Sequence, residues 1–352
     1  MAGAATSAAL ADCSLTFPYR DQAPRGHWLG ADSNFSLVLS ASRALMTFQD
    51  TFVGGSQTSS RMGSSMVGNS VASIDCDVGN YAIDYHWGGT AQNHRALFDE
   101  QALDGHRLWI HRPWLYAGKL FLTATRVTSD EQGFVEGGMT LARVANPLEA
   151  PESWSVEYFN LTDQRVTVGK GIAETEQYVY LFTPYQANMI LARVAKDRLL
   201  EASISEASLD YLKTDGSWGM GLVPASAKKL GLPANTGLTV RYSAAAKRWL
   251  ALFTDTSGWP SASIGVSSAE ALEGPWSKVA EIYSVPEMNP QAPEFDADNI
   301  CYGAAEHVAF NPEPDSQLLF TYTCNSTQLA KQLANMAIYV PRVVVVPHPL
   351  QP

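Results

Sequence analysis

The sequence has few charged residues and no run of basic ones. Only 17% of its 352 residues are charged, and 24 Lys and Arg against 35 Asp and Glu give a formal net charge of −11. Nucleic acids and anionic membrane surfaces bind clusters of Lys and Arg, and the sequence contains no such cluster. We therefore expect neither of them as a partner.

Long apolar segments are also lacking. The longest purely aliphatic run, Val343–Val346, is far shorter than the roughly 20 apolar residues that a membrane-spanning helix needs. The first residues are small and lack the basic start and the long apolar stretch of an intact signal peptide. They resemble the end of a removed signal or a flexible tail. We expect an irregular tail over residues 1–25 and a single domain over residues 26–352.

Cysteine is scarce, and its spacing fits no common zinc motif. Cys13, Cys76, Cys301 and Cys324 form no Cys-x-x-Cys pair and have no histidine at zinc-binding spacing, so no metal site is predicted. Cys301 and Cys324 flank a candidate hairpin and would face each other across it, which leaves Cys13 to pair with Cys76. Two disulfides indicate a secreted or periplasmic protein. The alternative is four reduced thiols in the core.

Glycine, proline and aromatic residues are abundant, with 26 Gly, 19 Pro, 9 Trp and 14 Tyr. This composition is typical of turn-rich β proteins, and exposed aromatic rings are a weak indication of sugar binding. Helical patterns are scarce, and Gln328–Leu333 predicts at most one short turn of helix. Short alternating segments separated by turn residues recur along the chain instead.

Predicted pairs of strands recur five times. The second strands of these pairs begin near residues 43, 119, 177, 248 and 317, and this spacing of about 60–75 residues suits large antiparallel sheets with variable loops. The segments 141–145 and 191–195 both read L-A-R-V-A. We predict an all-β fold, a five-bladed β-propeller of four-stranded antiparallel blades. A β-sandwich is the alternative, but it would not repeat this pattern five times.

An acidic hairpin is predicted near the start of the chain. Strands Asp32–Leu39 and Arg43–Asp50 flank a turn centred on Ala41, and this register places Asp32 opposite Asp50. Two carboxylates so close to each other repel, which raises the pKa of one of them. A functional site can use this effect. The alternative is a pair of solvent-exposed acids beside a turn.

A propeller predicts where a ligand would bind. The inner strand of each blade lines a central channel, and ligands collect where these strands begin. The candidates at that end are Asp32, the His111–Arg112 region, Lys170, residues 235–236 and the segment 301–307, with Asp50, Arg126 and Asp255 on partner strands. Two carboxyl groups with separated pKa values are what glycoside hydrolysis needs, because one protonates the leaving oxygen while the other attacks C1 or activates water.

Several short motifs resemble a known family. W-L-G-A-D-S-N-F-S-L at 28–37 and L-M-T-F-Q-D-T at 45–51 are similar to the opening of a group of secreted five-bladed propeller proteins, long known only as an uncharacterised bacterial domain. Gln49 stands where that group has glycine, and Val308 where proline is common. Further matches are G-N-S-V-A at 68–72, A-L-E-G-P-W-S at 271–277, C-Y-G-A-A-E-H-V-A-F at 301–310 and L-L-F-T-Y-T-C-N at 318–325.

The resemblance implies a glycoside hydrolase that cuts a furanose-containing polysaccharide, because members of the group include endo-D-arabinanases. D-arabinan is thus one candidate substrate, and Asp32 and Asp50 are the predicted catalytic pair. No cofactor is required, although a structural cation could occupy the central channel. A monomer is expected. The predicted substrate contacts are Asn69, His111, Arg112, Asp255 and His307.

Alternatives remain at two levels. His111 could instead be a core imidazole bonded to the backbone, and Asp255 a turn acid. The whole protein could be a carbohydrate-binding propeller without catalysis, or a propeller polysaccharide lyase that uses histidine and tyrosine.

Overall fold

The computed structural model describes residues 10, 13–21, 26–55, 57–77, 80–98, 106–130, 133–234, 237–255 and 263–350. Strands dominate this part of the chain and all pair in antiparallel fashion, so the predicted all-β class is confirmed. The α-helix α1 (Leu329–Ala334) has six residues and confirms the short helical turn expected there. None of the described helices has the length and apolar character to cross a membrane. The predicted tail lies largely outside the described residues.

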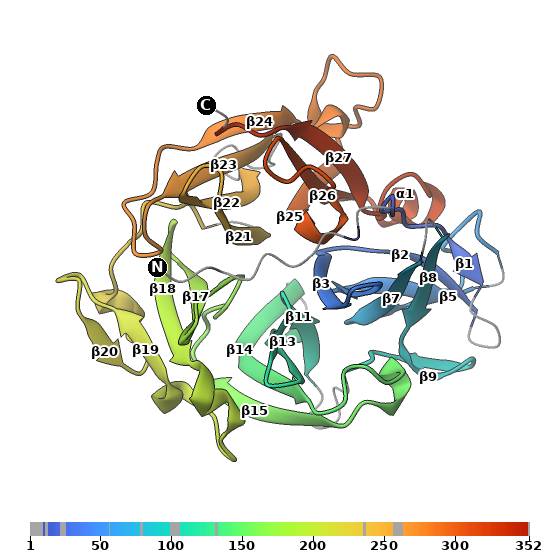
Figure 1. The fold of residues 1–352 in the computed structure, drawn as a ribbon. Coiled ribbons are helices and arrows are strands. Elements are labelled where there is room, and N and C mark those ends of the chain that lie inside the picture. Colours follow the sequence, from blue (N-terminus) through green and yellow to red (C-terminus); the bar gives the residue numbers. More distant parts are fainter. Residues whose placement is uncertain are drawn as a thin grey trace.

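Five sheets follow one another along the chain and stand in a ring around a common centre (Figure 1). The first contains β3 (Phe35–Ser40), β4 (Arg43–Phe48), β7 (Ser70–Asp77) and β8 (Asn80–His86). The second contains β11 (Arg107–Ile110), β13 (Lys119–Asp130), β14 (Gly133–Val144) and β15 (Val156–Thr162), with β12 (Trp114–Tyr116) paired to β13.

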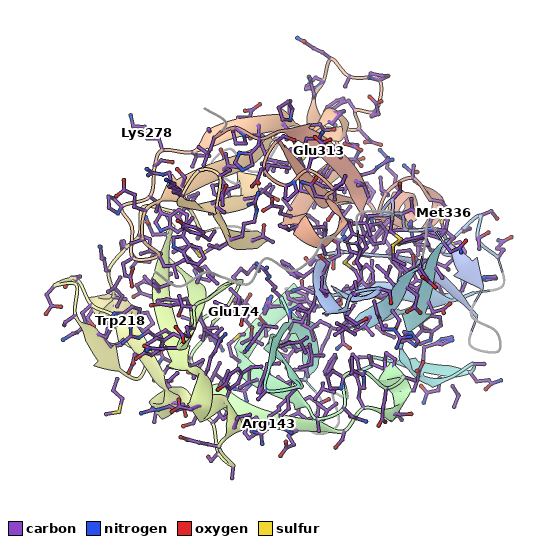
Figure 2. The ribbon with its side chains drawn as sticks, in the orientation of Figure 1. Arg143, Glu174, Trp218, Lys278, Glu313 and Met336 are labelled. Carbon is purple, nitrogen blue, oxygen red and sulfur yellow. A yellow bond between two sulfur atoms is a disulfide. The ribbon has the colours of Figure 1, made fainter. Side chains whose placement is uncertain are left out.

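The remaining three sheets complete the ring. The third contains β16 (Gly171–Glu174), β17 (Tyr178–Tyr185), β18 (Asn188–Ala195), β19 (Leu209–Leu212) and β20 (Trp218–Met220). The fourth contains β21 (Leu238–Ser243), β22 (Arg248–Asp255), β23 (Ser263–Ala269) and β24 (Ala280–Ser284). The fifth contains β25 (Asn299–Glu306), β26 (Gln317–Ser326) and β27 (Arg342–Pro347). In the third sheet Glu174 of β16 lies towards the centre, whereas Trp218 of β20 lies at the periphery (Figure 2).

The hydrophobic core is divided among the boundaries between neighbouring sheets. Leu45 and Val71 of the first sheet, for example, share a buried cluster with Leu108 and Leu120 of the second. Another cluster joins the first sheet to Phe310 and Leu319 at the fifth, so the two ends of the series pack together. Burial of these apolar surfaces between sheets is the main force that holds the ring.

The first hairpin has the predicted register but extends further than expected. Phe35 pairs with Thr47 and Val38 with Ala44, as a turn centred on Ala41 requires. Beyond a break, the same two chain segments pair again as β2 (His27–Ala31) and β5 (Thr51–Gly54), in a separate sheet with β1 (Arg20–Asp21) and β6 (Ser64–Val67). Asp32 and Asp50 therefore lie at the junction of two sheets, whereas the sequence predicted them as end residues of the strands Asp32–Leu39 and Arg43–Asp50.

Two segments whose sequences alone read as single strands, 66–74 and 335–340, do not form them. The segment 66–74 is divided between β6 and β7, because the chain breaks at Asn69, whose side chain bonds to Phe98. The segment 335–340 forms no strand, since Tyr339 adopts a positive φ of 58°. The excursion after residue 87 contains a small hairpin of β9 (Gly88–Thr90) and β10 (Asn93–Arg95).

Both predicted disulfides are present. Cys301 and Cys324 are directly paired residues of β25 and β26. Cys13 is bonded to Cys76 of β7, 63 residues away. The Tyr81 hydroxyl also donates to the carbonyl of Thr16 at 2.6 Å, so the segment that contains Cys13 is fixed to the first sheet.

Candidate active site

Asp32 and Asp50 are held opposite each other by backbone hydrogen bonds. The Asp32 amide donates to the Asp50 carbonyl at 3.2 Å, and the Gln49 amide donates to the Asp32 carbonyl at 3.1 Å. Ser33 adopts a positive φ of 49°, which turns the chain between β2 and β3. The predicted pairing of the two acids is confirmed, although they occupy a kink and not a strand end.

Two tyrosine hydroxyl groups donate hydrogen bonds to Asp32. It is 8% exposed, and its Oδ2 accepts hydrogen bonds from Tyr302 at 2.7 Å and Tyr339 at 3.3 Å. Its Oδ1 is buried and has no hydrogen-bond partner among the described residues. Burial and the nearby Asp50 raise the pKa of Asp32 to about 7, although the two tyrosines and Lys170 act in the opposite direction. Near neutral pH this carboxyl group can therefore carry a proton.

Asp50 has a different environment. Its Oδ1 accepts hydrogen bonds from Arg107 Nη1 and from Trp109 Nε1, both at 3.1 Å. Burial raises the pKa of Asp50, while the charge of Arg107 and the two hydrogen bonds counteract this rise. A cation and an indole N–H stabilise the ionised form. The two acids thus lie side by side with unlike partners.

The tyrosines beside Asp32 remain protonated. Burial, followed by the charge of Asp32, raises the pKa of both Tyr302 and Tyr339 well above 10. Asn325 Nδ2 donates to Tyr302 Oη at 3.3 Å, so that hydroxyl directs its own proton towards Asp32. Both tyrosines act as hydrogen-bond donors to a carboxylate.

Arg61 fixes the segment that carries Tyr339. It is fully buried, and it donates to the carbonyls of Leu29, Gln332, Asn335 and Ile338 at 2.6–2.9 Å. The guanidinium group thereby joins β2, which leads into Asp32, to the chain that leads into Tyr339. Its position explains how an irregular segment can place a hydroxyl group with precision.

The two predicted histidines serve the packing of the sheets. His111 Nδ1 lies 3.3 Å from Gln49 Nε2, and Nε2 lies 2.8 Å from Thr125 Oγ1. Burial, followed by the charge of Lys170, lowers the pKa of His111 well below its usual value. These contacts match the alternative of a core imidazole, although its partners here are side chains. Gln49, which replaces the glycine of the resembling group, is thus used to bind the second sheet.

His307 connects the first sheet to the fifth sheet, through Ser36 of β3 and Thr321 of β26. Its Nδ1 lies 2.9 Å from Ser36 Oγ, and its Nε2 lies 2.8 Å from Thr321 Oγ1. Burial and Arg112 lower its pKa to about 3. Like His111, it is a neutral residue that joins the first sheet to a neighbour.

The other predicted substrate contacts bind main-chain groups or lie apart. Arg112 donates to the carbonyls of Ile172 and Val240, and Asn69 donates to the carbonyl of Leu108 at 3.1 Å. Asp255 ends β22, where it pairs with Ser263. In the part of the chain that the structure describes, neither Arg112 nor Asn69 forms a hydrogen bond to Asp32 or Asp50, whereas His111 contacts Gln49, which directly precedes Asp50.

Three residues of the site were not predicted, and a fourth, Tyr302, lies in the predicted segment 301–307. Arg107 and Trp109 begin the second inner strand, four and two residues before His111, and the position of this strand start could have identified them. Tyr302 follows Cys301 at the start of the fifth inner strand and belongs to a quoted motif. No sequence pattern could have identified Tyr339, because the segment before it forms no regular strand that would place its side chain.

Comparison with known families assigns this chain to a group. The family model described as a domain of unknown function, DUF5005, matches residues 20–347. The chain belongs to the DUF5005 family. This match does not confirm the endo-D-arabinanase group that the sequence motifs resemble. No curated protein matches the chain.

Solved structures of other proteins share this fold. The DUF5005 chain is similar to a presumed hydrolase from Bacteroides ovatus, with a TM-score of 0.71 and 16% identity over 92% of this chain and 86% of that one. Weaker matches are the GH62 α-L-arabinofuranosidase of Coprinopsis cinerea (TM-score 0.49, 10% identity, 95% of each chain) and a GH43_1 enzyme of Xanthomonas citri complexed with xylose (TM-score 0.49, 11% identity, 91% and 87%). The first match shows a shared fold, and the weaker ones carry no argument about activity.

The raised pKa of Asp32 predicts how the stability of the DUF5005 protein depends on pH. The folded carboxyl group has a pKa of about 7, whereas an unfolded Asp titrates near about 3.9. The stabilisation that this raised pKa adds to the free energy of unfolding is therefore fully present below about pH 4, and it is lost as the pH rises through about 7. Asp32→Asn should raise the melting temperature relative to wild type at pH 8 and change it least at pH 4. Thermal unfolding across this range tests the expectation, and an equal shift at both ends would contradict it.

Gly30 provides a test of the Tyr339 contact. It has a φ of +118°, and a Cβ atom there would lie 2.1 Å from the Tyr339 carbonyl oxygen. Gly30→Ala should displace Tyr339 and weaken its bond to Asp32, which should lower turnover of any substrate by about tenfold or more. Gly63→Ala is the matched control, because Gly63 also has a positive φ of +78° but its Cβ would meet nothing within 4 Å. Similar turnover in both variants would contradict a positioning role for Tyr339.

Proposed function

We propose that this protein is a glycoside hydrolase that uses Asp32 and Asp50 as its catalytic carboxyl groups. The observation that carries the proposal is their direct pairing in environments that separate their acidities. Asp32 faces uncharged hydroxyl groups, whereas Asp50 faces a guanidinium group and an indole N–H. Pairs of acids with separated pKa values are typical of enzymes that cleave glycosidic bonds.

The two environments support a different role for each acid. Asp32 is the general acid, which transfers its proton to the glycosidic oxygen as the bond from C1 to that oxygen breaks. The carboxylate that remains on Asp32 gains stability from the hydroxyl groups of Tyr302 and Tyr339. Asp50 is the nucleophile that bonds to C1, and water later displaces it with Asp32 as the base. The backbone hydrogen bonds that join Asp32 to Asp50 and to Gln49 keep the two acids next to each other, and a short separation of the carboxyl groups would favour this retaining scheme over inversion.

The same proposal covers the architecture. The five sheets are interpreted as the blades of one five-bladed propeller, which is supported by the shared hydrophobic clusters and by the ring arrangement (Figure 1). The proposed substrate is a furanose-containing polysaccharide, with D-arabinan as a candidate, on the basis of the sequence motifs. Two disulfides support a secreted or periplasmic location. We retain the expectation of a monomer.

The lyase alternative is weakened by the partners of its candidate residues. A lyase needs a base to remove a proton from carbon, but Tyr302 and Tyr339 have pKa values raised well above 10. One ring nitrogen of each of His111 and His307 is bonded to a threonine, and burial lowers the pKa of both histidines. A carbohydrate-binding propeller without catalysis is the competing class that the experiment must separate.

Incubation with a polysaccharide panel tests the proposal. The purified protein should release oligosaccharides or pentose from D-arabinan, L-arabinan or xylan, with products separated by size, and ¹H NMR should show the anomeric configuration retained at first. Binding without product release would support the binding protein. Products with a C4–C5 double bond, detected by ultraviolet absorbance, would support a lyase and contradict the hydrolase.

A further inference from the structure

A cavity lies at the periphery, between the first and second sheets. Its volume is about 310 Å³, and its lining residues are Trp87, Gly88, Gly89, Leu97, Phe98, Pro151, Glu152, Trp154 and Val156. Trp87 follows β8, the last strand of the first sheet, and Val156 begins β15, the last strand of the second. Figure 1 shows β9 at the outer rim, beside the loop that leads into β15. The carboxyl pair instead contacts the inner strand β11 of the second sheet.

Aromatic rings form most of one wall. Phe98 and Trp154 pack together with ring centroids 6.1 Å apart, and the buried Trp87 also lines the cavity. The Trp154 indole N–H donates to the Glu149 carbonyl at 3.2 Å, which fixes the orientation of a ring that stays partly exposed. A fixed aromatic face offers a flat apolar surface to a ligand at a small entropic cost.

A charged group faces the same cavity. Glu152 contributes to the lining, and its Oε1 lies 2.9 Å from His86 Nδ1. The other ring nitrogen of His86 is buried without a hydrogen-bond partner among the described residues. Polar and apolar atoms both line the cavity, and its volume lies at the lower end of the size range of small-ligand sites, which begins at about 300 Å³.

We propose that this cavity is a second sugar-binding site, which holds one uncharged sugar ring of a polysaccharide against Trp154. The C–H face of a sugar matches the aromatic wall, and its hydroxyl groups match the acceptor atoms of Glu152. The carboxylate selects against sugars that carry carboxylate or sulfate groups. The choice of a sugar rests on the proposed function, whereas the cavity and its lining do not.

The cavity shares a structural element with the carboxyl pair. Asn69 Oδ1 accepts from the Phe98 amide at 2.9 Å, and Asn69 Nδ2 donates to the Leu108 carbonyl at 3.1 Å. Leu108 lies between Arg107 and Trp109, which bind Asp50. The predicted substrate residue Asn69 thus joins the wall of the cavity to the inner strand of the site. A glycan held at the rim would lie along the boundary that leads to the acids.

Binding of free monosaccharides tests the inference, because they contain no glycosidic bond that the protein could cleave. Saturation-transfer NMR with D-arabinose, L-arabinose and D-xylose should detect at least one of them, and Trp154→Ala should weaken its affinity about tenfold. Trp154→Phe keeps a ring and should retain most of the affinity. Trp218→Ala removes a partly exposed tryptophan of the third sheet and is the matched control. D-glucuronate should bind at least tenfold more weakly.

Each result bears on the inference separately from the hydrolase proposal. Absence of binding by all three sugars, unchanged affinity in Trp154→Ala, or equal binding of D-glucuronate would overturn the second site, even if the protein hydrolyses polysaccharide. Sugar binding that depends on Trp154, in a protein that releases no product, would support the second site and contradict the hydrolase. Thermal unfolding of Trp154→Ala distinguishes loss of the ring face from loss of folding.

Discussion

Asp50→Asn should lower kcat on a polysaccharide by about 10²–10⁴-fold, the range expected when a positioned catalytic group is removed. Asparagine fits the same volume and can still bond to Arg107 and Trp109, so the fold should be retained. The loss should affect kcat more than KM, because the lost interaction forms in the transition state. Steady-state kinetics on the best substrate of the panel give the measurement.

Asp32→Asn should show a comparable loss on polysaccharide but a different substrate dependence. An aryl glycoside has a leaving group that needs little protonation, so this variant should regain much of its rate there, whereas Asp50→Asn should not. Asp75→Asn is the control, since Asp75 forms a half-exposed ion pair with Arg43. If both active-site variants cleave the polysaccharide at the wild-type rate, the carboxyl mechanism is wrong. Equal recovery of both on the aryl glycoside would contradict the assigned roles.

Arg61→Met should reduce the free energy of unfolding by about 3–5 kcal/mol, the range found when one partner of a buried network is removed. Four carbonyl groups would lose their donor, and each unsatisfied buried group costs about 1–3 kcal/mol. Tyr339 should move as well, so turnover should fall together with stability. Urea denaturation, followed by tryptophan fluorescence, gives the free energy.

Arg43→Met is the matched control for this change. Arg43 binds Asp75 at 2.8 Å with both side chains nearly half exposed, and exposed ion pairs contribute only about 0–1 kcal/mol. Arg61→Lys should fall between the two variants, because an ammonium group cannot reach four carbonyls in the geometry of a planar fork. A loss in Arg61→Met no larger than in Arg43→Met would show that the four hydrogen bonds do not stabilise the fold.

Local patterns in the sequence determined the elements of this protein. Alternation of side chains and a turn centred on Ala41 are enough to define the register of β3 and β4, because a shift by one residue would reverse the buried face. The same local reasoning pairs Cys301 with Cys324 across β25 and β26. It also places Asp32 opposite Asp50, because the two acids lie at equal distances from the turn centred on Ala41.

Break points in the strands were harder to predict. The segment 66–74 reads as one apolar strand, but Asn69 interrupts it with bonds to Phe98 and Leu108. Those partners lie 29 and 39 residues further along the chain, and no local pattern shows their position. The contacts of His111 and His307, which were predicted to bind substrate, also depend on residues elsewhere in the fold. Their threonine partners lie 14 residues away on neighbouring strands, and only the register of the folded sheets brings them together.

The sequence by itself determined the pairing of the two acids, and the tertiary structure decided how they differ. Tyr302 and Tyr339 reach Asp32 from 270 and 307 residues away, whereas Arg107 and Trp109 reach Asp50 from the second sheet. The pKa of a carboxyl group depends on burial and on the charges and hydrogen bonds around it. These neighbours come from different sheets, so only the packing of the sheets against one another brings two tyrosine hydroxyl groups to Asp32 and a guanidinium group to Asp50.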